Sequence, residues 1–229
     1  MSMSLPRAIL LDFYGTVVEE DDVPIGKICS QISQVSPLGV TADEVGLYWG
    51  ETFYQLCVQT HGDTLQLQRE LELFSLRNIL KHFKADLDAD ELSQVLFDYW
   101  KHPLIFPESK EVLDQCRLPI CLVSNVDNAD LLSALEHNNL QFHWLLTSED
   151  CKAYKPRAEI FHKTLTMIGM SSAEVLHVGD SFRSDVLGAK ELGIPVLWVN
   201  RKRKAIPRED IAPDYISTDL RGLLSIMER

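Results

Sequence analysis

The sequence has little basic charge and no closely paired cysteines. Its 22 lysine and arginine residues stand against 34 aspartates and glutamates, which gives a formal net charge of −12. A chain this acidic argues against nucleic acid as a general partner, because binding a phosphate backbone requires clustered basic residues. The five cysteines are scattered without a CxxC pair. They therefore predict free thiols in a reducing compartment rather than disulfides or a zinc site.

Long hydrophobic runs and the common cofactor motifs are also missing. No stretch approaches the roughly 20 apolar residues of a transmembrane helix, and residues 1–7 lack the apolar region of a signal peptide. We therefore expect a cytoplasmic protein without a membrane partner. The absence of a Walker loop, a GxGxxG motif and a GxSxG motif leaves nucleotide-cofactor and serine-hydrolase chemistry unsupported.

Short apolar runs are present, and they alternate with helical patterns along most of the chain. Such alternation predicts βαβ units and a doubly wound parallel sheet, an α/β fold. Helical spacing of apolar residues marks 131–137, 159–168 and 186–192, and a short C-terminal helix is expected from about Asp219. The expected strands are 8–11, 120–123, 144–146, 175–178, 196–199 and the weaker 215–217.

A long segment separates the first expected strand from the others. A βαβ crossover needs only about 10–12 residues, so this gap must hold an inserted unit. Within it, apolar residues recur at helical spacing, and Thr41 and Asp88 each precede a glutamate by three residues, as at helix starts. We expect four helices here. The predicted domains are an α/β core of residues 1–17 and 104–229 and an α-helical cap of residues 18–103.

Polar residues stand where four of the expected strands end. Because the carboxyl ends of parallel strands meet at one edge of a sheet, we expect these side chains to converge there. Carboxylates gathered in this way either share a proton or bind a hard cation such as Mg²⁺. In chain order, the residues are Asp12, Tyr14, Thr16, Ser124, Asn125, Lys155, Asp180 and Asp185.

In these motifs the sequence resembles the haloacid dehalogenase (HAD) superfamily with an α-helical C1-type cap, over essentially its whole length. One short motif match would be a weak signal, but four matches in the expected order, with the cap in the expected gap, are specific. The four motifs correspond here to Asp12-Phe13-Tyr14-Gly15-Thr16, Ser124, Lys155-Pro156, and Gly179-Asp180 with Asp185.

The resemblance implies a catalytic role for several of these residues. Asp12 would be the nucleophile that forms a covalent intermediate, and Ser124 and Lys155 would hold the transferring group. Thr16 and Asn125 are further expected substrate-binding residues in the same motifs.

The resemblance also implies a metal site. Asp12, Asp180 and the main-chain carbonyl of Tyr14 would coordinate Mg²⁺, and Asp185 would support the ion from outside its coordination sphere. The expected activity is then Mg²⁺-dependent hydrolysis of a small phosphorylated metabolite through an aspartyl-phosphate on Asp12.

Tyr14 departs from the phosphatase pattern of the family, which has an aspartate there as general acid. A phenol, with an ordinary pKa near 10, is a poor substitute, so good leaving groups are expected to be favoured. Tyrosine at this position resembles the 2-haloacid dehalogenases, which need no metal and act on halogenated substrates. The acidic fourth motif, and Gly50 rather than arginine after Trp49, argue against that alternative.

A third possibility is a catalytically weak, metal-binding protein of the same fold. Any of these proteins would be a monomer or a homodimer.

Two remaining features carry structural expectations. His177 lies inside an expected strand and is expected to be a core residue. The basic run Arg201–Lys204 is expected to form a solvated loop, with a phosphate-attracting rim as the alternative.

Overall fold

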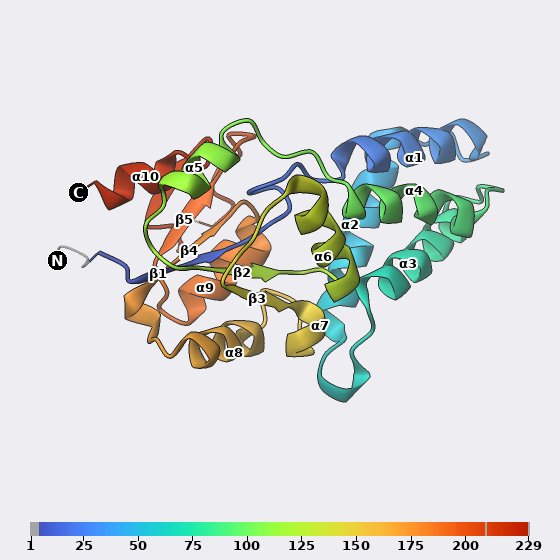
Figure 1. Ribbon diagram of the computed structural model, residues 1–229. Helices are drawn as coiled ribbons and strands as arrows, with labels where there is room; N and C mark the ends of the chain where they lie inside the picture. Colours follow the sequence, from blue (N-terminus) through green and yellow to red (C-terminus); the bar gives the residue numbers. More distant parts are fainter. Residues whose placement is uncertain (1–4, 209, 229) are drawn as a thin grey trace. The chain divides into compact units, whose positions relative to one another are not determined.

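The computed structural model describes residues 5–208 and 210–228 and contains a six-stranded sheet (Figure 1). All neighbouring strands are parallel, in the order β3-β2-β1-β4-β5-β6. The doubly wound α/β fold predicted from the sequence is confirmed. The strands are β1 (Ala8–Leu11), β2 (Ile120–Ser124), β3 (Trp144–Thr147), β4 (Val175–Gly179), β5 (Val196–Val199) and β6 (Tyr215–Ser217).

Helices cover both faces of this sheet (Figure 1). Alternate strand residues such as Leu10, Val123 and Trp198 join one apolar cluster with the helices on their face. The intervening residues, such as Ile9 and Leu11, are buried as well. Burial on both faces explains why the strands are continuous apolar runs in the sequence. The helices around the sheet are α5 (Ser109–Gln115), α7 (Ser148–Cys151), α8 (Ala158–Ile168), α9 (Gly188–Glu191) and α10 (Gly222–Met227).

The segment after β4 differs from the single helix expected over 186–192. A π-helical turn, Phe182–Leu187, precedes the short helix α9. The backbone N–H of Val186 donates to the Ser181 carbonyl at 3.2 Å, an i→i+5 contact, and the Ser181 side chain caps the turn at Ser184 N. Wider turns of this kind occur frequently at functional sites. Here the turn carries Asp185.

Five helices belong to a separate compact unit. They are α1 (Asp22–Val35), α2 (Ala42–Gln59), α3 (Gln68–His82), α4 (Ala89–Lys101) and α6 (Asn128–Asn138). The two helix starts predicted from the sequence are present. Thr41 and Glu44 form a reciprocal capping box at α2, and the Asp88 carboxylate accepts from the Asp90 and Glu91 N–H groups at α4.

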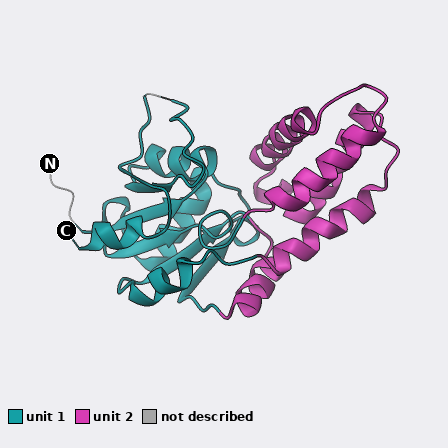
Figure 2. Ribbon diagram, turned by 90° about the horizontal axis from the view of Figure 1, so that it is seen from above, with its two compact units in different colours: residues 1–19, 104–125, 140–229 teal, residues 20–103, 126–139 magenta. Residues whose placement is uncertain are grey.

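The chain thus divides into two compact units (Figure 2), one of residues 1–19, 104–125 and 140–229, the other of residues 20–103 and 126–139. Helix α6, which the sequence-based division places in the core, groups with the helical unit. The Asp127 carboxylate accepts from the N–H groups of Gln68 and Arg69 at 2.7 and 3.1 Å, and the Arg69 guanidinium pairs with Asp130.

Among the helices that the structure describes, none combines the length and the apolar character that a membrane span requires.

Candidate active site

The predicted convergence of polar residues takes place at the carboxyl edge of the sheet. Strand β1 lies between β2 and β4, so Asp12 emerges between their ends. The Asp12 N–H donates to the Val178 carbonyl at 2.9 Å, which ties the residue to the end of β4. Ser124 ends β2, and both Asp12 and Ser124 are buried, at 6% and 1% exposure.

Lys155 lies at the centre of the site, between two carboxylates. Its Nζ donates to Asp12 Oδ1 and to Asp185 Oδ1, each at 2.7 Å. Burial alone would lower the pKa of this lysine, but the two carboxylates raise it above its usual range. Lys155 is therefore a permanent ammonium ion at neutral pH.

Asn125 holds the backbone of Lys155. Its side-chain amide donates to the Lys155 carbonyl at 3.0 Å and accepts from the Lys155 N–H at 2.7 Å. Both polar atoms of the amide are therefore engaged within the protein. In this structure Asn125 links the end of β2 to the start of the Lys155 segment, and its substrate-binding role remains a prediction.

Thr16 holds the second oxygen of the expected nucleophile. Its hydroxyl donates to Asp12 Oδ2 at 2.9 Å, so each oxygen of Asp12 has one protein donor. Burial raises the pKa of Asp12 above its ordinary value, and the charge of Asp185 adds to that effect, although Lys155 opposes both. One lysine is thus shared between two carboxylates that both require it.

His177 is a functional contact that the sequence analysis missed. Its ring is fully buried in β4, with Nε2 2.9 Å from Asp185 Oδ1 and its edge against Phe161. Among the described residues Nδ1 has no hydrogen-bond partner. Burial would raise the pKa of Asp185, but Lys155 and His177 hold it below its usual range. His177 therefore helps to keep Asp185 ionised and oriented. A strand histidine two residues before the Gly179-Asp180 motif was the available signal.

Two glycines leave room for the carboxylates. A Cβ on Gly179 would lie 2.3 Å from Asp185 Cγ, and one on Gly15 would lie 2.5 Å from Asp180 Oδ1. Gly15 also has φ +82°, in the left-handed region that favours glycine. The close approach of the two carboxylates to the backbone explains why a glycine precedes Asp180 and another follows Tyr14.

Asp12, Asp180 and Asp185 together could hold a cation. Each offers a carboxylate oxygen, and the three atoms lie within 4.8 Å of one another. Hard oxygen ligands of this kind suit Mg²⁺. Lys155 supplies one positive charge for three carboxylates, so the donor set and the charge balance both fit a divalent ion.

Tyr14 lies beside this site in the loop after β1. Its ring packs edge-on against Phe13, with centroids 5.1 Å apart, and its backbone bridges to Val18.

Arg201 contacts the same loop, although the sequence analysis assigned it to a solvated run. Arg201 is instead 18% exposed and pairs with the buried Glu108.

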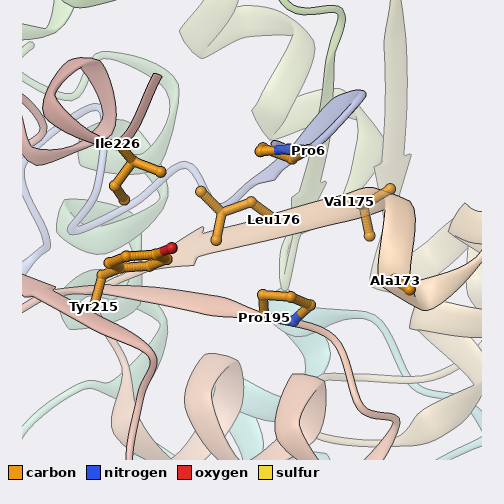
Figure 3. A pocket seen from close by; sticks show the side chains of 7 residues that line it. All are labelled: Pro6, Ala173, Val175, Leu176, Pro195, Tyr215 and Ile226. Atoms are coloured by element: carbon orange, nitrogen blue, oxygen red, sulfur yellow. The ribbon is translucent and has the colours of Figure 1, made fainter. Parts of the chain in front are cut away.

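A small apolar pocket at the other edge of the sheet is not part of this site (Figure 3). It lies among the amino ends of β4 and β6 and the residues just before β1 and β5. Its lining residues carry no carboxylate, ammonium or imidazole group. They are Pro6, Ala173, Val175, Leu176, Pro195, Tyr215 and Ile226.

Comparison with known proteins identifies the family. Residues 9–199 match the haloacid dehalogenase-like hydrolase family, to which the chain belongs. An (S)-2-haloacid dehalogenase from Pseudomonas fluorescens is 24% identical over 221 residues, 93% of each chain. A phosphoserine phosphatase from Thermus thermophilus is 29% identical over 141 residues, 58% of this chain and 55% of the relative.

Solved structures show the same fold. The crystal structure of the L-2-haloacid dehalogenase RSc1362 superimposes with a TM-score of 0.82 at 21% identity, covering 99% of this chain and 100% of the other. The predicted family is confirmed, and it is a family of hydrolases. Taken alone, the comparisons support the dehalogenase alternative better than the phosphatase prediction, because the phosphatase relatives found by sequence, enzymes of Pyrococcus furiosus and Thermus thermophilus, cover only 38% and 58% of this chain, whereas dehalogenases match along nearly all of it.

Proposed function

We propose that this protein hydrolyses a small phosphorylated metabolite with Asp12 as nucleophile and Mg²⁺ as cofactor. The cluster of Asp12, Asp180 and Asp185 within 4.8 Å carries this proposal. A fold hosts several chemistries, and the site residues decide among them. At 24% identity or below, the full-length dehalogenase relatives indicate the family more firmly than the substrate. We therefore give the carboxylate cluster more weight than the activities of these relatives.

The residues of the site divide the work of a two-step displacement. Asp12 forms a new oxygen–phosphorus bond while the bond to the leaving oxygen breaks, and the leaving oxygen takes the electron pair. Lys155 offsets the negative charge of Asp12, and Thr16 fixes its orientation. Ser124, at the end of β2, is the proposed donor to the transferring group. Water then hydrolyses the aspartyl-phosphate and restores Asp12.

The proposed metal ligands are Asp12, Asp180 and the main-chain carbonyl of Tyr14, with Asp185 in support. When bound, Mg²⁺ would offset negative charge on the transferring phosphoryl group. Asp185, held by Lys155 and His177, would keep that region anionic before the ion arrives.

Tyr14 defines the expected substrate preference. The loop position that would supply a general acid carries a phenol, so the leaving oxygen must depart with little protonation. Acyl or aryl phosphates should therefore react far faster than alkyl phosphates. General acid catalysis typically contributes about 10²–10⁴-fold, which sets the expected gap.

Dehalogenation of a 2-haloacid is the second candidate, favoured by Tyr14 and by the full-length relatives. Asp12 would then attack carbon to form an ester, and halide would leave with the electron pair without needing a proton. Water would hydrolyse the ester. In this chemistry Lys155 would balance Asp12 and Asp185, and Asp180 would have no evident role.

A substrate panel separates the candidates. Aryl, acyl and alkyl phosphates and 2-haloacids should be assayed with Mg²⁺ and with EDTA, using Asp12→Asn as the inactive control. The proposal expects aryl or acyl phosphate turnover that EDTA abolishes. Undiminished 2-haloacid turnover in EDTA would establish the alternative, and equal turnover by Asp12→Asn would reject Asp12 as nucleophile in either reaction.

A further inference from the structure

The loop that follows the nucleophile is held from outside the four motifs. Arg201 lies two residues beyond β5, and its guanidinium reaches the loop between Asp12 and Val18. Nη2 donates to the Thr16 carbonyl at 2.7 Å and Nε to the Gly15 carbonyl at 3.2 Å. Two consecutive peptide carbonyls of the catalytic loop thus share one arginine.

The arginine is itself held by two other side chains, in a turn that a third side chain stabilises. Its Nη1 donates to Glu108 Oε1 at 2.7 Å, and its guanidinium carbon lies 3.5 Å from the centroid of the Phe106 ring. Asn200 shapes the following turn, donating to the Lys204 carbonyl and accepting from the Lys204 N–H, each at 2.8 Å. A planar guanidinium held in this way offers its donors in one fixed geometry.

The held peptides carry two groups that lie against carboxylates of the site. Thr16 donates its hydroxyl to Asp12 Oδ2, and the Cα of Gly15 lies against the Asp180 carboxylate. Fixing the carbonyls of residues 15 and 16 fixes the planes of the peptides that follow them. The direction of the Thr16 side chain is therefore set from both sides of its Cα.

From this geometry we infer that Arg201 is a positioning residue for Asp12, acting through Gly15 and Thr16. Its hydrogen bonds go to neither the nucleophile nor the carboxylates expected to bind the metal. It nevertheless determines the position of the Thr16 hydroxyl. The inference rests on the proposed role of Asp12 as nucleophile, and it applies to attack on phosphorus and on carbon alike.

The principal test compares Arg201→Met with Arg203→Met, which removes the same charge from an exposed residue in the same turn. Arg201→Met should lower kcat by about 10- to 100-fold with little change in KM, because a misplacement of about 1 Å can lower the rate by about 10²-fold. Arg201→Lys keeps the positive charge but loses the planar set of donors of the guanidinium. Its kcat should lie between those of Arg201→Met and the wild type. Arg203→Met should match wild type.

Loss of Arg201 also leaves Glu108 as a buried, unpaired carboxylate, so stability must be separated from positioning. In Arg201→Met/Glu108→Gln, the unpaired charge is gone and Tm should recover. The kcat should stay low, because the Gly15 and Thr16 carbonyls still lack their donor. Recovery of kcat together with Tm would reduce Arg201 to a structural residue and overturn the inference.

Hydrogen exchange gives a readout that does not depend on turnover. Arg201→Met should speed amide exchange in the peptide covering residues 12–18, and Arg203→Met should not. Unchanged exchange together with unchanged kcat would refute the positioning role.

If the wild type turns over no phosphate and no 2-haloacid, the proposed function fails. Faster amide exchange in Arg201→Met would then still show that Arg201 positions the loop of residues 12–18. Unchanged exchange would overturn that inference.

Discussion

Two buried carboxylates, one in each unit, have opposite charge states. Asp185 in the sheet unit is 1% exposed and accepts from Lys155 and His177, which keep it ionised. Glu72 in the helical unit is 4% exposed, and its Oε1 has no hydrogen-bond partner among the described residues. Burial raises the pKa of Glu72 to about 8, and the charge of Asp21 contributes.

The difference shows what a buried cation does for function. At neutral pH Glu72 is mostly the uncharged acid, because no cation offsets the loss of its hydration. Asp185 has Lys155 and His177 as donors, so it remains an anion, and Lys155 also opposes the effect of burial on Asp12. The position of one lysine therefore distinguishes the ionised Asp185 from the neutral Glu72.

The largest effect is expected when that lysine is removed. Lys155→Met leaves two buried carboxylates without their cation and should lower the free energy of unfolding by about 3–5 kcal/mol, with loss of turnover. Denaturant unfolding should be compared with Lys110→Met, which removes an exposed lysine of the same unit. Adding Asp185→Asn to Lys155→Met should restore part of the stability. Absence of any recovery would mean that the unpaired charge is not the cause.

The second effect concerns the neutral acid. The pKa of Glu72 in the folded protein lies above its ordinary value of 4.5, so the folded state binds more protons between pH 4.5 and about 8. The contribution of Glu72 to stability is therefore fully present below that window and is lost as pH rises through it, by up to about 1.4 kcal/mol per pH unit. Glu72→Gln should remove this part of the slope, as measured by denaturant unfolding at several pH values. The exposed Glu136→Gln should leave the slope unchanged; a slope equally steep in Glu72→Gln would contradict the assignment.

The smallest effect is expected for an ion pair that is not buried. Arg77 and Asp90 pair at 2.9 Å in the helical unit, but their side chains are 57% and 67% exposed. Arg77→Met should change the free energy of unfolding by less than about 1 kcal/mol, because water and salt screen the pair. A loss comparable to that of Lys155→Met would show that burial does not set the scale of these interactions.

The strands and the main site residues could be predicted because local patterns determine them. A parallel strand covered on both faces must be a continuous apolar run, and its carboxyl end must face the ligand edge. Asp12, Lys155 and Asp185 follow from that rule together with the family motifs. Their shared contacts confirm that the motifs meet at one edge.

The features that escaped prediction depend on partners far away in the chain. The role of His177 requires a carboxylate eight residues later that folds back through a π-helical turn. Arg201 stands in a basic run typical of a solvated loop. Its contacts with Glu108 and with a loop 185 residues earlier distinguish it from Arg203. Helix α6 groups with the helical unit because it packs against α4, and Asp127 just before it accepts from the first N–H groups of α3. Apolar periodicity contains none of this information.

The most direct test of the account is the binding of Mg²⁺ without any substrate. Isothermal titration calorimetry at neutral pH should show one bound ion per chain in the wild type, and Asp180→Asn should abolish binding because it removes one of the three clustered carboxylates. Glu136→Gln, which removes a carboxylate from an exposed position, should bind as the wild type does. Equal binding by Asp180→Asn, or no binding by the wild type, would contradict the proposed metal site and favour the metal-free reaction at carbon.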